Sequence, residues 1–137
     1  MTARRAAVVD GANVAYAEMS QGDQPKVSNL VAVRRALEER GYETIVIVVD
    51  ASLRHRVDDP DQLEALIDGG TVHQAPAGTD ADYFLLETAD HLGAVVVSND
   101  TYEDYRDDYA WIPERRLPLM IINGRVVLYD EEVASDR

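Results

Sequence analysis

Short runs of apolar residues, separated by segments with helical spacing, constrain the fold of this chain most strongly. Residues 44–49 (TIVIVV) form a continuous and mainly β-branched run, which is typical of a strand buried on both faces of a parallel sheet. Similar runs at 6–10 (AAVVD) and 94–98 (AVVVS) indicate two further strands, and 71–75 (TVHQA) indicates a weaker one. Strands that alternate with helices predict a three-layer α/β/α sandwich around a mostly parallel sheet.

Helix signals occupy the intervals between these runs. Residues 27–40 have helical spacing of apolar side chains, and 61–68 follow an Asp-Pro pair that favours a helix start. A Thr-x-x-Asp capping pattern predicts that Thr79 opens a helix that extends to residue 92. Near the C-terminal end, Asn-Gly between residues 117–122 and 125–129 predicts a tight hairpin that closes the edge of the sheet.

Composition limits the class of protein. The chain has 137 residues, of which 46% are hydrophobic and 28% charged, so we expect a single domain over residues 1–137, with residues 130–137 as a frayed tail. It has no cysteine, which excludes thiolate metal sites, cysteine nucleophiles and disulfides. The sequence offers no apolar run long enough to cross a membrane. We therefore expect a cytoplasmic protein.

The charge balance of the chain is unusual. It contains 26 acidic and 13 basic residues, for a formal net charge of -13, and such a field repels nucleic acid at long range. A strongly solvated surface is the ordinary explanation, but clustered aspartates also suit a magnesium or manganese site.

Five aspartates fall where such a site is expected. Asp10 ends the first strand, Asp100 follows the strand at 94–98 with Asp104 four residues later, and Asp80 and Asp82 begin a helix. If the first and fourth strands are neighbours, these carboxylates meet at one edge of the sheet, where α/β folds bind ligands. Each also has a local explanation as a turn former, a helix cap or a helix-dipole carboxylate.

Three segments of the chain resemble the NYN branch of the PIN-like ribonucleases, and the Regnase-type enzymes in particular. The segments are VVDGANVA (8–15), DYFLLETAD (82–90) and VVVSNDTYEDY (95–105), followed by ERRL at 114–117. The resemblance covers nearly the whole chain. It departs from the family in two respects: Ala81 separates two aspartates that are often adjacent, and without cysteine the chain has no Cys3His zinc finger.

This resemblance implies a PIN-like (NYN) fold and endonucleolytic cleavage of single-stranded or loop RNA with Mg²⁺ or Mn²⁺. The implied metal and catalytic residues are Asp10, Asp82, Asp100 and Asp104, with Asn13 beside them as a further catalytic residue. Among these, Asp10 and Asp100 are assigned as direct metal ligands, and Asp82 and Asp104 as ligands through water or as groups that align the nucleophile. Relatives also use a glutamate from an earlier helix, for which the sequence offers Glu38 and Glu39.

Candidate substrate contacts lie in the same part of the chain. Ser98 and Asn99 precede Asp100, and Tyr102 offers a stacking face for a base. Arg115 and Arg116 are the preferred pair for gripping phosphate, because a guanidinium binds phosphate bidentately. Paired arginines on helix faces also serve simply to balance nearby glutamates. RNA is thus the expected partner, and the apolar hairpin is a possible surface for a homodimer.

Other functions remain as alternatives. A phosphoacceptor receiver domain requires a lysine after a late strand, but the only lysine is Lys26; a haloacid dehalogenase site requires D-x-D after the first strand, but residue 12 is Ala. The main alternative is a PIN-like module without catalytic activity that serves as a scaffold for RNA or protein.

Overall fold

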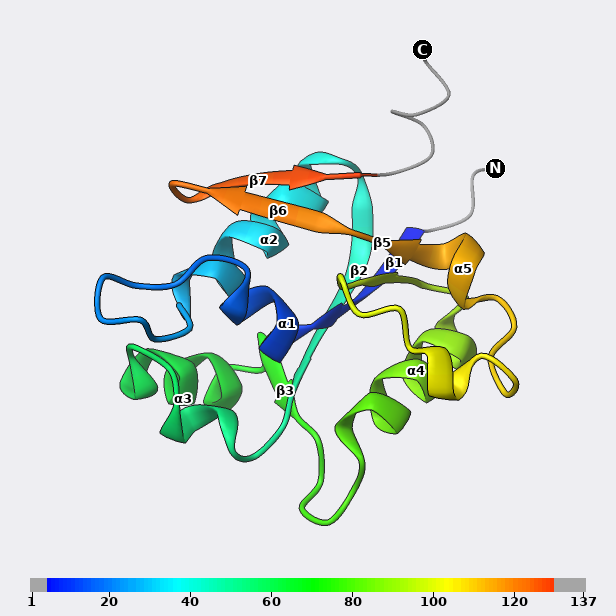
Figure 1. The fold of residues 1–137 in the computed structure, drawn as a ribbon, viewed down its shortest axis with the longest axis horizontal. Coiled ribbons are helices and arrows are strands. Elements are labelled where there is room, and N and C mark those ends of the chain that lie inside the picture. Colours follow the sequence, from blue (N-terminus) through cyan, green and yellow to red (C-terminus); the bar gives the residue numbers. More distant parts are fainter. Residues whose placement is uncertain (1–4, 130–137) are drawn as a thin grey trace.

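The structure is a computed structural model, and it describes residues 5–129. Five parallel strands form the central sheet, in the order β3-β2-β1-β4-β5 (Figure 1). Their bounds are β1 Arg5–Asp10, β2 Tyr42–Val49, β3 Val72–Gln74, β4 Val95–Val97 and β5 Arg116–Leu117. The predicted strands are therefore present, and the predicted α/β/α sandwich with a parallel sheet is confirmed.

Helices cover both faces of the sheet, and alternation along β1 explains how. Ala7 and Val9 pack into the core cluster with residues of α1, α2 and α3, whereas Val8 packs into the cluster with α4, and all three are fully buried. The helices are α1 Gly11–Tyr16, α2 Ser28–Glu39, α3 Pro60–Asp68, α4 Ala81–Leu92 and α5 Ile112–Arg115, with single 3-10 turns η1 Leu53–His55 and η2 Glu103–Tyr105. Figure 1 shows α1 and α3 on one side of the strands and α4 on the other.

The predicted hairpin forms, but not at the edge of the main sheet. Strands β6 (Leu119–Ile122) and β7 (Arg125–Leu128) pair antiparallel across Asn123 and Gly124 as a separate two-stranded sheet. Leu119, Ile121 and Leu128 belong to the same core cluster as α2. The prediction that the hairpin closes the sheet is thus wrong, because its apolar face is used to cover a helix while the short β5 forms the edge.

Two other local predictions change. The segment after Asp10 forms the six-residue helix α1 rather than only a turn, and it is too short for a periodic apolar pattern to reveal. The N-cap of α4 is Asp80, whose side chain accepts a hydrogen bond from the Asp82 amide, so Thr79 is not the cap. The predicted frayed tail at 130–137 lies outside the described residues.

The direction in which successive strands are added to the sheet reverses between β1 and β4. The chain proceeds from β1 outward through β2 to β3, and then returns to the other side of β1 with β4. Val9 pairs with Val97 across β1 and β4, so the neighbouring strands that the site hypothesis requires are present. Ligands of parallel α/β sheets bind at the carboxyl ends of such strands, where the order reverses. No helix within residues 5–129 is long and apolar enough to cross a membrane.

Gly11 provides a test of the packing between α1 and β2. A Cβ at this position would lie 2.5 Å from Cγ1 of Val49 and 2.7 Å from the backbone oxygen of Val48. We expect Gly11→Ala to lower the free energy of unfolding by about 1–3 kcal/mol through overpacking, measured by urea denaturation. Gly22→Ala is the control, because its nearest neighbour would be a side-chain oxygen at 3.8 Å. Equal stability of the two variants would contradict the close approach of α1 to β2.

Candidate active site at the carboxyl ends of β1 and β4

Asp10 is the buried centre of the site. It ends β1 and is the N-cap of α1, where its Oδ1 accepts a hydrogen bond from the Asn13 amide at 3.2 Å. Only 9% of the residue is exposed. A carboxylate in such a position requires further donors, because burial of an unpaired charge is costly.

Two hydroxyl groups supply these donors from the segment after β4. Oδ2 of Asp10 accepts hydrogen bonds from Ser98 Oγ at 3.1 Å and from the Tyr102 hydroxyl at 2.5 Å. Ser98 Oγ in turn accepts a hydrogen bond from the Asp100 amide at 3.0 Å. The Ser98 hydroxyl therefore connects the Asp10 carboxylate to the backbone of Asp100.

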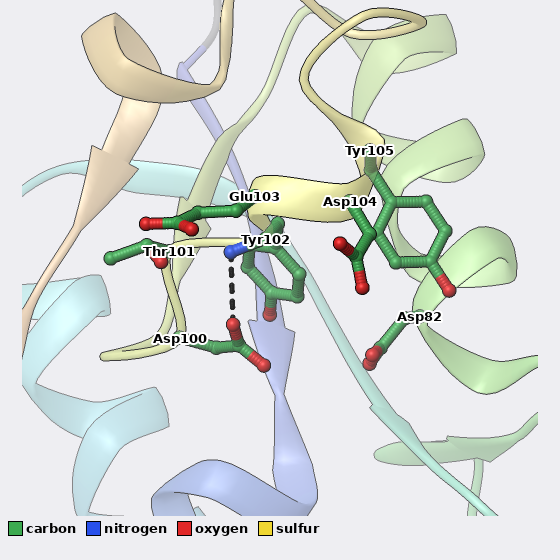
Figure 2. A pocket seen from close by; sticks show the side chains of 7 residues that line it. All are labelled: Asp82, Asp100, Thr101, Tyr102, Glu103, Asp104 and Tyr105. Carbon is green, nitrogen blue, oxygen red and sulfur yellow. Dashed lines mark hydrogen bonds between the residues drawn. The ribbon is translucent and has the colours of Figure 1, made fainter.

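The backbone at Tyr102 shapes the turn that presents the other aspartates. Tyr102 has φ of 51°, in the left-handed region that a residue with a bulky side chain rarely adopts. Its amide donates to Asp100 Oδ1 at 2.9 Å, as the dashed line in Figure 2 shows. The residue as a whole is 2% exposed. The buried side chain, this hydrogen bond and the one from the Tyr102 hydroxyl to Asp10 hold the chain in a strained turn that leads directly into Asp104.

Two asparagines link this turn to the rest of the molecule. Asn13 Oδ1 accepts a hydrogen bond from the Asn99 amide at 2.9 Å. The Asn99 side chain then pairs with both the amide and the carbonyl of Leu119, each at 2.9 Å. Asn13 and Asn99 thus connect α1, the turn and the start of β6, which fixes the position of the turn.

Three aspartates and Glu103 line one cavity of about 280 Å³ beside this turn. Asp82 comes from the first turn of α4, Asp100 from the turn after β4 and Asp104 from η2, and Figure 2 shows their side chains directed into a common space. The lining residues are Asp82, Asp100, Thr101, Tyr102, Glu103, Asp104 and Tyr105. The four predicted aspartates are therefore brought to one edge of the sheet, although Asp10 does not line the cavity itself and reaches it through its hydrogen bond with Tyr102.

The carboxylates at the cavity repel one another. Burial, and then the negative charges of Asp10 and Asp100, raise the pKa of Asp82 to about 6. Burial also raises the pKa of Asp10, although its hydrogen bonds from Tyr102, Asn13 and Ser98 oppose this effect. The carboxylates therefore lie close enough to destabilise one another's charged forms.

These residues fit an Mg²⁺ or Mn²⁺ ion that takes few protein ligands and keeps several waters. Carboxylate oxygens are the donors that such hard cations prefer. Within residues 5–129, however, no three acidic or histidine side chains are arranged to hold one metal ion. Mg²⁺ commonly keeps several waters and takes only one or two carboxylates together with substrate phosphates. The donor set suits that open arrangement and not a closed protein cage.

Two acidic residues to which the sequence analysis gave no role also lie near the site, Asp80 and Asp50. Asp80 caps α4 and accepts a hydrogen bond from the Tyr105 hydroxyl. Asp50 follows β2, forms an ion pair with Arg56 at 3.4 Å, and its charge contributes to the raised pKa of Asp82. Asp50 could have been found from the sequence, because it follows a buried strand just as Asp10 does.

The predicted substrate contacts have varied surroundings. Ser98 and Tyr102 are both buried, and their hydroxyls are directed to Asp10, so Tyr102 does not present the open stacking face that was expected of it. Arg116 donates from Nη1 to the Ser98 carbonyl at 3.2 Å, next to the turn. Arg115 lies over the Trp111 ring, 3.8 Å from its centre, and donates from Nη2 to the Ala89 carbonyl. Arg115 and Arg116, although adjacent in sequence, thus bind different backbone segments.

Neither glutamate of α2 lines the cavity. Glu38 forms an ion pair with Arg34 at 3.6 Å, and Glu39 lines a separate groove beside the hairpin.

Comparisons with known proteins agree with this architecture. The family model of the Zc3h12a-like ribonuclease NYN domain matches residues 3–135. No curated protein sequence has significant similarity to the chain.

Two similar solved structures are of nuclear proteinaceous RNase P 2 (PRORP2) from Arabidopsis thaliana. One has a TM-score of 0.69 and 23% identity over 89% of this chain and 29% of the other. The second has a TM-score of 0.69 and 22% identity over 93% of this chain and 30% of the other. This chain therefore spans less than a third of those proteins, and the likeness establishes the fold.

Removing the Tyr102 hydroxyl tests the support of Asp10. We expect Tyr102→Phe to raise the pKa of Asp10, because the hydrogen bond from Tyr102 lowers it, and to reduce the free energy of unfolding by about 1–3 kcal/mol. Carboxyl-carbon NMR titration and urea denaturation measure the two effects. Tyr105→Phe is the matched control, since its hydroxyl binds Asp80. An unchanged Asp10 titration in Tyr102→Phe would refute this arrangement.

The raised pKa of Asp82 predicts a pH-dependent gain of stability on its removal. Because the pKa is raised in the folded state, the stability that protonated Asp82 contributes is complete below about pH 4 and is lost as pH rises through about 6. In EDTA, Asp82→Asn should be more stable than wild type by about 1 kcal/mol near pH 7.5, since solvent screening reduces the full linkage value. The difference should be much smaller near pH 4.5 and should disappear only below about pH 4.

Denaturation at both pH values checks this prediction. Asp107→Asn, which removes an exposed carboxylate outside the cavity, controls for the loss of one negative charge. A gain of the same size in both variants would show that net charge, and not the cavity, is responsible.

Proposed function

The chain belongs to the Zc3h12a-like ribonuclease NYN domain family, and we propose that it is a metal-dependent endoribonuclease acting on single-stranded or loop RNA. The observation that carries the proposal is the cavity in which Asp82, Asp100 and Asp104 face one another, with the charge of the buried Asp10 near enough to raise the pKa of Asp82. We propose these four aspartates, with Asn13 as the residue that helps to fix the turn, as the catalytic centre. The cytoplasm is its expected location.

Each aspartate has a distinct part in this proposal. Asp10 and Asp100 would hold Mg²⁺ or Mn²⁺, since the Asp10 carboxylate is oriented by three donors and Asp100 by the Tyr102 amide. Asp82 and Asp104 would act through water. When bound, the cation neutralises the phosphate oxygens and stabilises the leaving oxygen.

Asp82 is proposed to align the attacking water and accept its proton. A general base works best when its pKa lies near the working pH, and the cavity raises the pKa of Asp82 to about 6. Its place in the first turn of α4 directs it toward the cavity. The hydroxyls of Ser98 and Tyr102 are proposed to act on the substrate indirectly, by orienting Asp10.

One observation favours a second candidate, a module without catalytic activity that binds RNA or protein. In the part of the chain that the structure describes, no set of three acidic or histidine side chains is positioned to hold a metal ion. A scaffold would keep the fold but would gain no stability from divalent cations.

Cleavage of end-labelled RNA tests the proposal directly. We expect wild-type protein to cut single-stranded RNA, and not the matching DNA, in Mn²⁺ or Mg²⁺ but not in EDTA. Asp10→Asn and Asp100→Asn should each reduce the rate at least ~100-fold, the scale of losing one transition-state contact. Asp107→Asn should cleave at the wild-type rate because its side chain lies outside the cavity. Metal-independent cleavage, or full activity in both Asp10→Asn and Asp100→Asn, would rule out this mechanism.

Thermal unfolding separates a working cation site from a vestigial one. A ligand that binds only the folded state raises its stability, so millimolar Mn²⁺ should raise the Tm of wild type but not that of Asp100→Asn. No shift in wild type, together with no cleavage, would favour the scaffold.

A further inference from the structure

A protein with a net charge of -13 can bind an RNA backbone only at a surface where positive side chains are locally in excess. Four of its described cations are already neutralised by carboxylates. The ion pairs are Lys26–Glu18 at 2.7 Å, Arg34–Glu38 at 3.6 Å, Arg54–Glu64 at 3.8 Å and Arg56–Asp50 at 3.4 Å.

Most of the other described arginines are engaged by the protein itself. Their guanidinium groups donate to backbone carbonyls, in the pairs Arg5 to Arg40, Arg106 to Thr101, Arg115 to Ala89 and Arg116 to Ser98, and Arg40 has an interaction of its own.

Arg35 and Arg125 differ from these. Both are exposed, and within residues 5–129 neither side chain has an ion pair or a hydrogen bond. They line the same groove of about 300 Å³ between α2 and the tip of the hairpin. Glu39 also lines the groove and does not lie within ion-pair distance of either arginine. Two cations without counter-ions therefore face one acidic residue.

A second, more apolar hollow adjoins this groove. It has a volume of about 510 Å³, is lined by Ile122, Asn123, Arg125 and Val127, and shares Arg125 with the groove. Ile122 is 54% exposed. The chain from Pro118 to Tyr129 contains no acidic residue, so the hairpin itself carries no negative side chain. A guanidinium beside an exposed apolar surface suits a phosphate with its attached base.

Hydrogen bonds hold the hairpin at both ends, and it begins beside the turn that follows β4. At its tip, Glu18 accepts hydrogen bonds from the amides of Asn123 at 2.5 Å and Gly124 at 3.0 Å. At its base, Leu119 is paired with Asn99, the residue before Asp100. The four residues of β6 span roughly 13 Å. A single strand that leaves the cavity along β6 would therefore meet Arg125 and then Arg35.

We propose that Arg35 and Arg125 form an accessory binding site for the backbone of single-stranded RNA, with Ile122 and Val127 contacting a base. This inference rests on the proposed ribonuclease function and assigns the path of the substrate outside the catalytic cavity. The site acts on affinity for long RNA and takes no part in the cleavage step.

Binding in EDTA tests the site without cleavage. Fluorescence anisotropy is measured with labelled single-stranded RNA of about 16 and about 4 nucleotides. Arg35→Ala and Arg125→Ala should each weaken binding of the longer RNA roughly three- to tenfold and reduce the salt slope by about one. Binding of the shorter RNA should change less. Glu39→Gln should tighten binding, because it removes the negative charge in the groove.

Arg54→Ala is the matched control, because Arg54 is also exposed but is paired with Glu64. The proposal is overturned if this control weakens binding as much as the groove variants, or if wild type does not bind the longer RNA. It is also overturned if sedimentation shows a wild-type dimer that Ile122→Ser separates, since the hairpin would then be a protein interface. Loss of binding in the groove variants without any cleavage in Mn²⁺ would retain the accessory site and reject the ribonuclease.

Discussion

The buried carboxylate of Asp10 is the group on which the site depends. It lies at the end of the central strand, where it caps α1 and accepts hydroxyl hydrogen bonds from Ser98 and Tyr102. Burial alone would favour its neutral form, and three donors oppose that effect. Because two of the donors belong to the turn after β4, the need to satisfy one charge determines where that turn lies. The positions of Asp100 and Asp104 follow from this constraint.

The same constraint explains why the cavity carries unbalanced negative charge. Three protein donors bind Asp10 but bring no positive charge, so its field adds to that of Asp100 and raises the pKa of Asp82. No lysine or arginine lines the cavity among the described residues; Arg106 and Arg116 bind backbone carbonyls, and Arg56 pairs with Asp50. Such concentration of like charge is typical of functional sites. This repulsion is the electrostatic basis for the cation site proposed above.

Much of this arrangement could be predicted from the sequence, because it depends on local patterns. The β-branched run at 44–49 and the aspartates after apolar strands predicted the sheet and the edge at which the carboxylates meet. The helix α1 could not be predicted, since six residues give no period. The support of Asp10 by Tyr102 joins residues 92 positions apart, and no local rule indicates it. The α4 cap was placed one residue too early because Thr79 and Asp80 are both good caps, and only the backbone conformation decides between them.

The arginines show most clearly what sequence leaves undetermined. Adjacent arginines at 115 and 116 suggest a phosphate clamp, yet their side chains are used by Ala89, Trp111 and Ser98. Arg35 and Arg125 are 90 residues apart and still share one groove. Whether a cation is available depends on which acids and carbonyls lie near it in space, and sequence spacing does not report this. The separation of charge that results, with carboxylates at the cavity and unpaired arginines beyond β6, would orient an anionic strand. Under the proposed function, the cavity repels the backbone of this strand wherever no cation bridges it, and Arg125 and Arg35 attract it beyond the hairpin.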